Sequence, residues 1–402
     1  MKISDFLTAY CLDPAQIDGE AYLEELLRQM ALGLGGTGHI PMLPSYLSAT
    51  GIMPANESCC VLDAGGTNLR SALAHFDLAG DCHLGPVQTC PMPGSLGPMA
   101  LDEFYGAIAA QVRQLGAPER IGFCFSYNLL MGRELDGTLQ AWCKEIQVPQ
   151  ALGRPVGASL REALGGDCTV RLVNDSVAAM LGACGLGRTA QVGLILGTGV
   201  NVCYEERCGA IGKITEPLLG DSMIISTEVG EFDGIPKGEL DWALIDATGE
   251  PELAHAEKQC AGGYLGQLIC LAWDRAAEAG LLLPVFRGAA YSLAQISQML
   301  DGHDSPIPAD DAACRIARTI IHRAAKIAAI LCAGPVLRCT QPGGSVNIAV
   351  EGSQFYKLSG FAPLFRQELL ALLQPRGIRF AFLRGENACL KGAAVAAFSQ
   401  PM

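Results

Sequence analysis

Two short glycine-containing turns carry the residue types that hold phosphate groups. They are Asp63-Ala-Gly-Gly-Thr-Asn-Leu-Arg70 and Leu196-Gly-Thr-Gly-Val-Asn201. Backbone N–H groups approach phosphate oxygens closely only where no Cβ intervenes, and hydroxyl and amide side chains add further donors. Both turns therefore predict phosphate contacts. The alternative is that each glycine pair only makes a hairpin turn between two strands.

Neither turn matches the two common nucleotide-binding motifs. The P-loop requires G-x-x-x-x-G-K-[ST] and the dinucleotide-binding fingerprint requires G-x-G-x-x-G, each followed by a helix. Here a strand-like run follows each turn, Ser71–Phe76 after the first and Val200–Tyr204 after the second. Both motifs are excluded.

Asp63 stands directly before the first turn. A carboxylate is a poor neighbour for phosphate unless a divalent cation lies between them, directly or through water, and a Mg²⁺–nucleotide complex meets that need. The alternative for Asp63 is a carboxylate that caps its own turn.

A second pair of polar residues, Asn174 and Asp175, follows the strand-like run Thr169–Val173 and precedes a helix. Side chains at such a strand end project into the cleft at the carboxyl edge of a sheet, where a carboxylate can accept a hydroxyl proton as general base. The alternative is a helix N-cap, which Asn-Asp-Ser makes well. Asn201, behind the second turn, is a further candidate donor.

Two strand–turn–strand units, 59–76 and 192–204, are separated by segments that contain helices. This repetition predicts a duplicated α/β architecture in which each half presents a glycine turn to one central cleft. Any hinge is expected within structured connections near 173–190. Cys314–Leu331 is predicted to be a long helix, Leu390–Phe398 a short one and 251–265 a helical stretch. The segment 41–47 is predicted to connect domains, because its two prolines exclude a helix interior.

The composition fits a folded enzyme-sized protein. The chain has 402 residues, of which 50% are hydrophobic and 17% charged, so two domains are expected and disorder is excluded. A formal net charge of −13 makes nucleic acid an unexpected partner. The 17 cysteines include no C-x-x-C pair, which predicts buried thiols rather than a zinc site or a disulfide framework.

No stretch of the sequence predicts a membrane span or a secretion signal. The longest apolar run, Ile327–Leu337, covers 11 residues, whereas a span needs about 20. We therefore expect a cytoplasmic protein with no membrane partner.

Six motifs in order resemble the hexokinase/glucokinase family. They are the two turns above, Val173-Asn-Asp-Ser-Val177, Ser226-Thr-Glu-Val-Gly-Glu-Phe232, Glu257-Lys258 with Gly262-Gly-Tyr-Leu-Gly266, and Glu351-Gly-Ser353. The segment Met42-Leu-Pro-Ser-Tyr46 is similar to the stretch before the family's first phosphate turn, so the resemblance runs from residue 41 to the end.

The resemblance implies the actin-like ATPase fold, an α/β fold of two RNase H-like domains around a central cleft. The small domain is expected over 57–173 plus 391–402, and the large domain over 1–56 plus 174–390. The implied activity is ATP-dependent phosphorylation of a hexose, glucose first, at the 6-hydroxyl, with Mg²⁺. The length resembles that of a bacterial-type, single-copy member.

The resemblance also implies roles for individual residues. Asp175 is the general base, and the sugar ligands are Ser126, Cys143, Lys144, Asn174, Asn201, Glu228 and Glu257. Asp63, which also holds Mg²⁺ through water, belongs to the nucleotide and phosphate set with Gly65, Gly66, Thr67, Asn68, Arg70, Gly197, Thr198, Gly199, Gly352 and Ser353. A hexose suits such carboxylates and amides because each hydroxyl both donates and accepts.

Departures from the family pattern leave the preferred sugar and the adenosine contacts open. Cys143 replaces Thr, Asn128 replaces Pro, Val229 replaces Trp and Glu351 replaces Asp. A sugar- or nucleotide-sensing protein without turnover is the main alternative, and a chaperone-like or filament-forming ATPase is the third. The retained Asp175 and both turns favour the enzyme.

Overall fold

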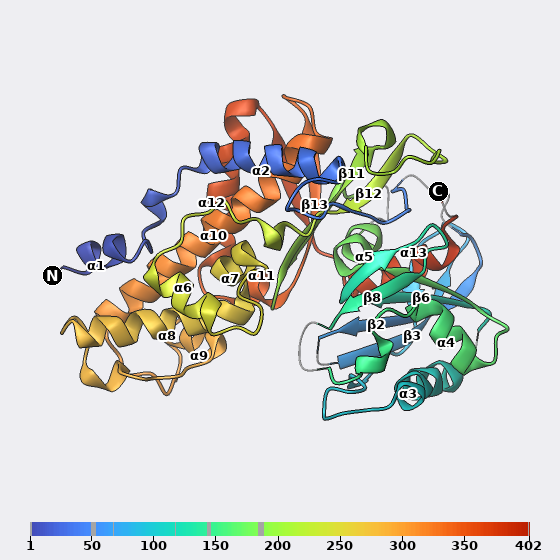
Figure 1. Cartoon of the computed structure of the whole chain (residues 1–402), viewed down its shortest axis with the longest axis horizontal. Coiled ribbons are helices and arrows are strands. Elements are labelled where there is room, and N and C mark those ends of the chain that lie inside the picture. The colour runs from blue at the N-terminus through green and yellow to red at the C-terminus, as the bar shows by residue number, and fades with distance from the viewer. Residues whose placement is uncertain are drawn as a thin grey trace.

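The structure is a computed structural model that describes residues 2–49, 54–66, 68–116, 118–142, 146–183, 189–400 and 402. Within these ranges the strands form two six-stranded sheets and one small hairpin. The sheets lie in different halves of an elongated molecule, with the N-terminus at the far end of the helix-rich half (Figure 1).

The first sheet has the strand order β4-β3-β2-β6-β9, and β5 also pairs with β3. Helices α3 and α4 share one buried cluster with this sheet, and α13 packs against its other face. The bounds are β2 Ser58–Gly65, β3 Asn68–Phe76, β4 Cys82–Leu84, β5 Gln88–Pro91, β6 Arg120–Phe125, β9 Thr169–Val173, α3 Leu101–Gln114, α4 Val156–Leu164 and α13 Ala388–Phe398.

The second sheet has the strand order β1-β12-β11-β10-β13-β14. Its strands are β1 Leu43–Pro44, β10 Val192–Leu196, β11 Val200–Arg207, β12 Ser222–Ser226, β13 Ser345–Glu351 and β14 Arg379–Leu383. The helices of this half are α1 Ile3–Ala9, α2 Gly19–Leu34, α6 Glu239–Asp246, α7 His255–Cys260, α8 Gly262–Glu278, α9 Leu293–Leu300, α10 Asp311–Cys339, α11 Ser353–Lys357 and α12 Phe361–Leu373.

The two sheets repeat one pairing pattern. In the first, β2 pairs antiparallel with β3 and parallel with β6, β3 pairs antiparallel with β4, and β9 lies parallel to β6. In the second, β10 pairs antiparallel with β11 and parallel with β13, β11 pairs antiparallel with β12, and β14 lies parallel to β13. Each predicted turn closes its hairpin, with Gly65 opposite Asn68 and Leu196 opposite Val200. The predicted duplication is confirmed.

Helices α5 (Asp175–Gly182) and α13 pack against each other between the two sheets, where α5 contacts β10 and β13 and α13 contacts β2 and β6. A Cβ at Gly182 would lie 1.9 Å from the Ala388 oxygen, and a Cβ at Gly392 would lie 1.9 Å from the Ala178 oxygen. Only glycine permits this close approach. This close contact holds α5, whose first residue is Asp175, at the junction of the two halves.

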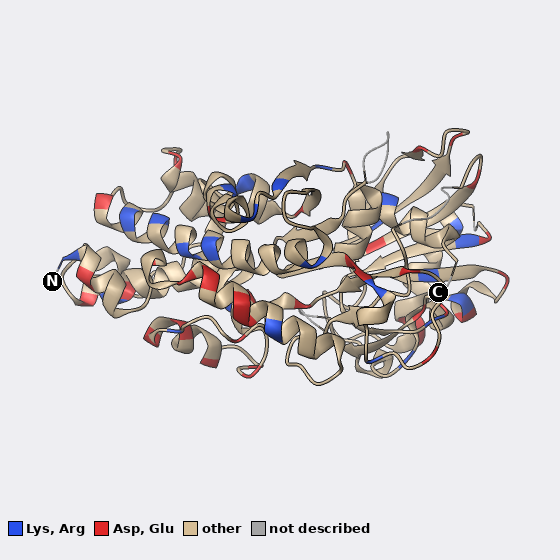
Figure 2. Cartoon of the chain, turned by 90° about the horizontal axis from the view of Figure 1, so that it is seen from above, with Lys and Arg blue, Asp and Glu red and all other residues tan. Residues whose placement is uncertain are grey.

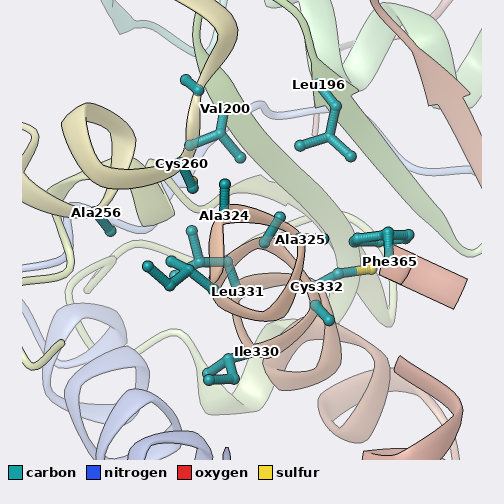
Figure 3. Packing of buried hydrophobic residues seen from close by; sticks show 14 of the residues in the cluster. Leu196, Val200, Ala256, Cys260, Ala324, Ala325, Ile330, Leu331, Cys332 and Phe365 are labelled. Atoms are coloured by element: carbon teal, nitrogen blue, oxygen red, sulfur yellow. The ribbon is translucent and has the colours of Figure 1, made fainter. Parts of the chain in front are cut away.

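Helix α10 runs through the core of the second half. Figure 3 shows its small side chains, Ala324 and Ala325 among them, with Leu196 and Val200 of the neighbouring strands nearby. In the described part of the chain it is the one helix long and apolar enough to cross a membrane, and 83% of that apolar window is buried. Its apolar composition follows from its place in the core.

The structure differs from the sequence prediction in three elements. Helix α10 is longer than 314–331, because it continues through Pro335 while packing against α2. The segment 41–47, predicted to connect domains, contains β1 at the sheet edge, where Pro44 pairs with Ile225; edge strands tolerate proline. The helical stretch predicted over 251–265 is two helices, α7 and α8, because Ala261 has an extended backbone.

Acidic and basic residues are interspersed along both halves of the chain (Figure 2). The exact domain limits given above stay a prediction.

Candidate active site

A cavity of about 310 Å³ lies between the two sheets. The predicted site residues in its lining are Ser126, Asn174, Asp175, Thr198, Gly199, Asn201, Glu228 and Glu257. One wall comes from the end of β6 and from the hairpin β7 (Asn128–Met131) and β8 (Gly137–Ala141), and the other from β11, β12 and α7. Residues from both halves of the chain therefore meet in one space.

Asn174 and Asp175 lie where β9 ends and α5 begins. Asn174 Oδ1 accepts hydrogen bonds from the Ser176 backbone N at 2.9 Å and from Ser176 Oγ at 2.7 Å, so it is the helix N-cap. It also lines the cavity, so a helix N-cap and a side chain that projects into the cleft are compatible at this position. Asp175 is the first residue of α5, where the helix dipole favours a negative charge.

Two hydrogen bonds join Asn201 and Glu228. Asn201 Nδ2 donates to Glu228 Oε1 at 2.6 Å, and Asn201 Oδ1 accepts from the Glu228 backbone N at 3.1 Å. Glu228 has φ of 57°, a left-handed conformation that is uncommon for a residue with a side chain. Such strain persists only where surrounding contacts enforce it, which is typical of functional sites.

Burial in the cavity raises the pKa of Glu228 to about 7. The carboxylates of Asp175 and Glu257 contribute to this raised pKa, whereas hydrogen bonds from Ser226 and Asn201 oppose it. Near neutral pH this carboxyl group is therefore divided between its charged and neutral forms. Either form can pair with a hydroxyl, which donates as well as accepts.

Glu257, on α7, approaches the second turn. Its Oε2 accepts a hydrogen bond from the Val200 backbone N at 2.9 Å. A Cβ at Gly199 would lie 2.5 Å from that same oxygen. Gly199, predicted for phosphate contact, is thus also needed to admit the Glu257 carboxylate.

The second turn is held by the start of α8. The backbone N of Gly262 donates to the Gly197 oxygen at 2.9 Å, and that of Gly263 donates to the Thr198 oxygen at 3.0 Å. Gly352, at φ of +117°, lies against the same turn, and Ser353 begins α11 directly after it. The second turn and the 352–353 pair are therefore neighbours.

In the first turn, Asp63 is paired with Arg70 across the β2–β3 hairpin. Arg70 Nε donates to Asp63 Oδ2 at 3.0 Å, and Arg70 Nη2 contacts the same oxygen. Asp63 is 3% exposed. Gly65 and Asn68 form the last pair of the hairpin, and the Gly66 oxygen accepts from Tyr127 Oη at 3.1 Å.

None of the described residues of the first turn is in the cavity lining. Three predicted site residues, Thr67, Cys143 and Lys144, lie outside the described residues. Among the described residues there is no group of three or more metal-ligating side chains. A magnesium ion needs fewer, because it is usually held by one or two carboxylates together with phosphates and water. Asp63 beside the turn fits that requirement.

Several residues of the cavity were not predicted. They include Ser226, Trp142 and Lys258. Lys258 is buried, which lowers its pKa, and its Nζ donates to the Leu253 oxygen at 2.7 Å and to the Glu250 oxygen at 2.5 Å. It thereby fastens the loop at the cavity rim. In the sequence, Lys258 was marked only by its place beside Glu257 in the family motif.

Known families and proteins resemble this chain over most of its length. Two family models, both described as hexokinase, match residues 2–184 and, in overlapping stretches, 191–311 and 292–399. Hexokinase-1 of Oryza sativa subsp. japonica is 30% identical over 267 residues, covering 60% of this chain and 53% of that protein. Hexokinase-2 of Rattus norvegicus is 27% identical over 421 residues, covering 92% of this chain and 45% of that protein. The chain spans about half the length of these relatives.

Solved structures share the fold. A hexokinase from Schistosoma mansoni complexed with glucose superimposes with a TM-score of 0.83 at 22% identity, with 98% of each chain covered. A ROK family glucokinase from Streptomyces griseus in complex with glucose and AMPPNP gives a TM-score of 0.54 at 18% identity, with 85% of this chain and 99% of that chain covered.

Proposed function

This chain belongs to the hexokinase family and has the actin-like ATPase fold of two RNase H-like domains, and from that premise we propose that it transfers the γ-phosphoryl group of ATP to the 6-hydroxyl of a hexose. Glucose is the first candidate, because both structures compared above contain it. That glucose is the preferred hexose is a separate and more specific proposal.

The observation that carries the proposal is the shared cavity. One carboxylate at a strand end, Asp175, faces the same 310 Å³ space as Asn201, Glu228 and Glu257. A hexose hydroxyl left unpaired in such a site costs roughly 1–3 kcal/mol, so several polar groups around one small cavity suit a sugar. In this proposal they hold the hydroxyls, and Asp175 accepts the proton of the 6-hydroxyl.

Phosphoryl transfer places modest demands on Asp175. The transition state is loose, so the attacking hydroxyl loses its proton late and an ordinary carboxylate suffices as acceptor. Asp175 is the first residue of α5, and the helix dipole there favours a negative charge.

The two turns are proposed to hold the triphosphate. Asp63 would hold Mg²⁺ through water, and the ion would neutralise phosphate charge. Arg70, which pairs with Asp63 in this structure, would offer its guanidinium group to a phosphate oxygen. The pairing of Gly352 with the second turn supports an adenosine position beside Ser353.

We also propose that the sugar closes the two domains about the 174–187 connection, of which residues 184–187 lie outside the described part of the chain. Ser126 lies on one side of the cavity, and Asn201 and Glu228 lie on the other. Arg133, in the β7–β8 turn, already contacts the other half of the chain: it donates to the Pro217 oxygen at 3.1 Å and pairs with Glu216 at 3.2 Å. Small-angle scattering with and without sugar tests closure; an unchanged radius of gyration would count against it.

The decisive experiment is a coupled assay of sugar-dependent ADP release with glucose, mannose, fructose and N-acetylglucosamine. Release with at least one hexose is expected, and the rates would rank the sugars. Sugar binding by calorimetry with no release for any sugar would instead favour the sensing protein. A cytoplasmic location is part of the proposal and is tested by cell fractionation.

A further inference from the structure

Ser226, the last residue of β12, contacts three of the predicted site residues. Its Oγ accepts a hydrogen bond from Asn201 Nδ2 at 3.0 Å, and it lies 2.8 Å from Glu228 Oε1 and 3.3 Å from Asn174 Oδ1. The Ser226 side chain is 4% exposed. A hydroxyl has a single proton, so Ser226 donates to only one of these acceptors at a time.

The geometry favours Glu228 as that acceptor. Glu228 Oε1 is the nearer atom, and a carboxylate accepts a stronger hydrogen bond than an amide oxygen does. Asn174 Oδ1 already accepts two hydrogen bonds from Ser176. Ser176 Oγ, at 3.5 Å from Ser226 Oγ, is the most distant neighbour.

We propose that Ser226 is a positioning residue that keeps Glu228 ionised and aimed at the sugar. This rests on the proposed function, in which Glu228 binds sugar hydroxyls. Ser226 acts through Glu228, and no substrate contact is assigned to it.

The hydrogen bond from Ser226 affects the ionisation of Glu228 because the nearby carboxylates oppose it. Asp175 on α5 and Glu257 on α7 both disfavour its ionised form. On its own segment, Glu231 accepts from the Ala254 backbone N at 2.8 Å. The one cation of α7 in the cavity lining, Lys258, donates to backbone oxygens instead. Donors such as Ser226 and Asn201 are therefore the groups that favour the charged carboxylate.

Removing the hydroxyl should raise the pKa of Glu228. A hydrogen bond to a charged group lowers the pKa of an acid, so its loss in Ser226→Ala shifts the midpoint upward by about one pH unit. A sugar hydroxyl donates best to the ionised form. Sugar affinity should then fall by about fivefold near pH 7 and hardly change near pH 9, where Glu228 is ionised in both proteins.

The experiment measures glucose binding by calorimetry without nucleotide, across this pH range. Ser226→Thr keeps a hydroxyl and should restore the profile of the unchanged chain. Ser222→Ala is the matched control, because Ser222 lies on the same strand and donates to the Glu205 carboxylate at 2.7 Å, outside the cavity. Its profile should not move.

An equal loss of affinity at both ends of the range would overturn the proposal, because a merely structural defect does not depend on Glu228 ionisation. If the alanine variant does not fold, Ser226→Cys, a weaker donor of similar size, should shift the midpoint in the same direction by less.

A second readout needs no sugar. Infrared difference spectra against Glu228→Gln follow the Glu228 carboxyl group through its titration, and the midpoint should rise in Ser226→Ala. An unmoved midpoint refutes the role of Ser226. A chain that binds none of the tested hexoses refutes the proposed function, while the infrared midpoint still decides the role of Ser226.

Discussion

Replacing Glu228 by glutamine should stabilise the fold and weaken sugar binding at once. The amide keeps the oxygen that accepts from Asn201 and Ser226, and it removes a charge that the buried site disfavours. Function therefore costs stability at this position, which is a common property of ligand-binding sites.

The size of the effect follows from the pKa. Glu228 has an ordinary pKa of 4.5 and a folded-state pKa of about 7, so between these values the folded chain holds a proton that the unfolded chain has lost. Stability consequently falls as the pH rises through this window. The accumulated cost is roughly 3 kcal/mol at pH 8 and under about 1 kcal/mol at pH 5.

The assay is urea unfolding of the unchanged chain and Glu228→Gln at several pH values, with calorimetry of sugar binding. The variant should be more stable by roughly 3 kcal/mol near pH 8, with the gain shrinking toward pH 5, and its sugar affinity should fall by roughly 1–3 kcal/mol. Glu162→Gln, an exposed change on α4, is the control and should alter neither quantity. A stability gain that does not vary with pH, or a loss near pH 8, would refute the reasoning.

Four further predictions test other parts of the site and fold. Asp175→Asn should nearly abolish turnover while sugar affinity stays within a few-fold, and steady-state turnover within about tenfold of the parent would remove Asp175 as the base. Gly199→Ala should displace the Glu257 carboxylate and lower sugar affinity by roughly 1–3 kcal/mol in calorimetry without nucleotide. Arg133→Met should weaken sugar binding about two- to fivefold by removing the contact between the halves; equal weakening of nucleotide binding would contradict this. Asp241→Asn should lower the free energy of unfolding by roughly 3–5 kcal/mol, because it breaks a fully buried pair with Arg323 at 2.8 Å.

The sequence alone determined the local features of this protein. The strand–turn–strand units were predictable because two apolar runs joined by a glycine turn need only their own residues to form a hairpin. The pair Asn174-Asp175 was predictable for the same reason, since a strand end followed by a helix start is a local pattern. Asn174 proved to serve both as the N-cap and as part of the cavity lining.

The tertiary structure determined where helices and strands depart from what the local sequence predicts. Helix α10 passes Pro335, which a local rule treats as a helix end, because packing against α2 and the second sheet compensates for the missing backbone donor. Pro44 joins a sheet because it lies at the edge. These outcomes depend on neighbours that are distant in sequence.

The site residues, too, depend partly on the local sequence and partly on the tertiary structure. Glu228 and Glu257 were singled out through the family resemblance, and no spacing pattern marks them as partners. Ser226 carries no signal by itself, since a serine at a strand end is ordinary. The raised pKa of Glu228 depends on its burial and on Asp175 and Glu257, which come from α5 and α7. Only folding brings these groups together, because electrostatic interactions depend on distance in space and not on distance along the chain.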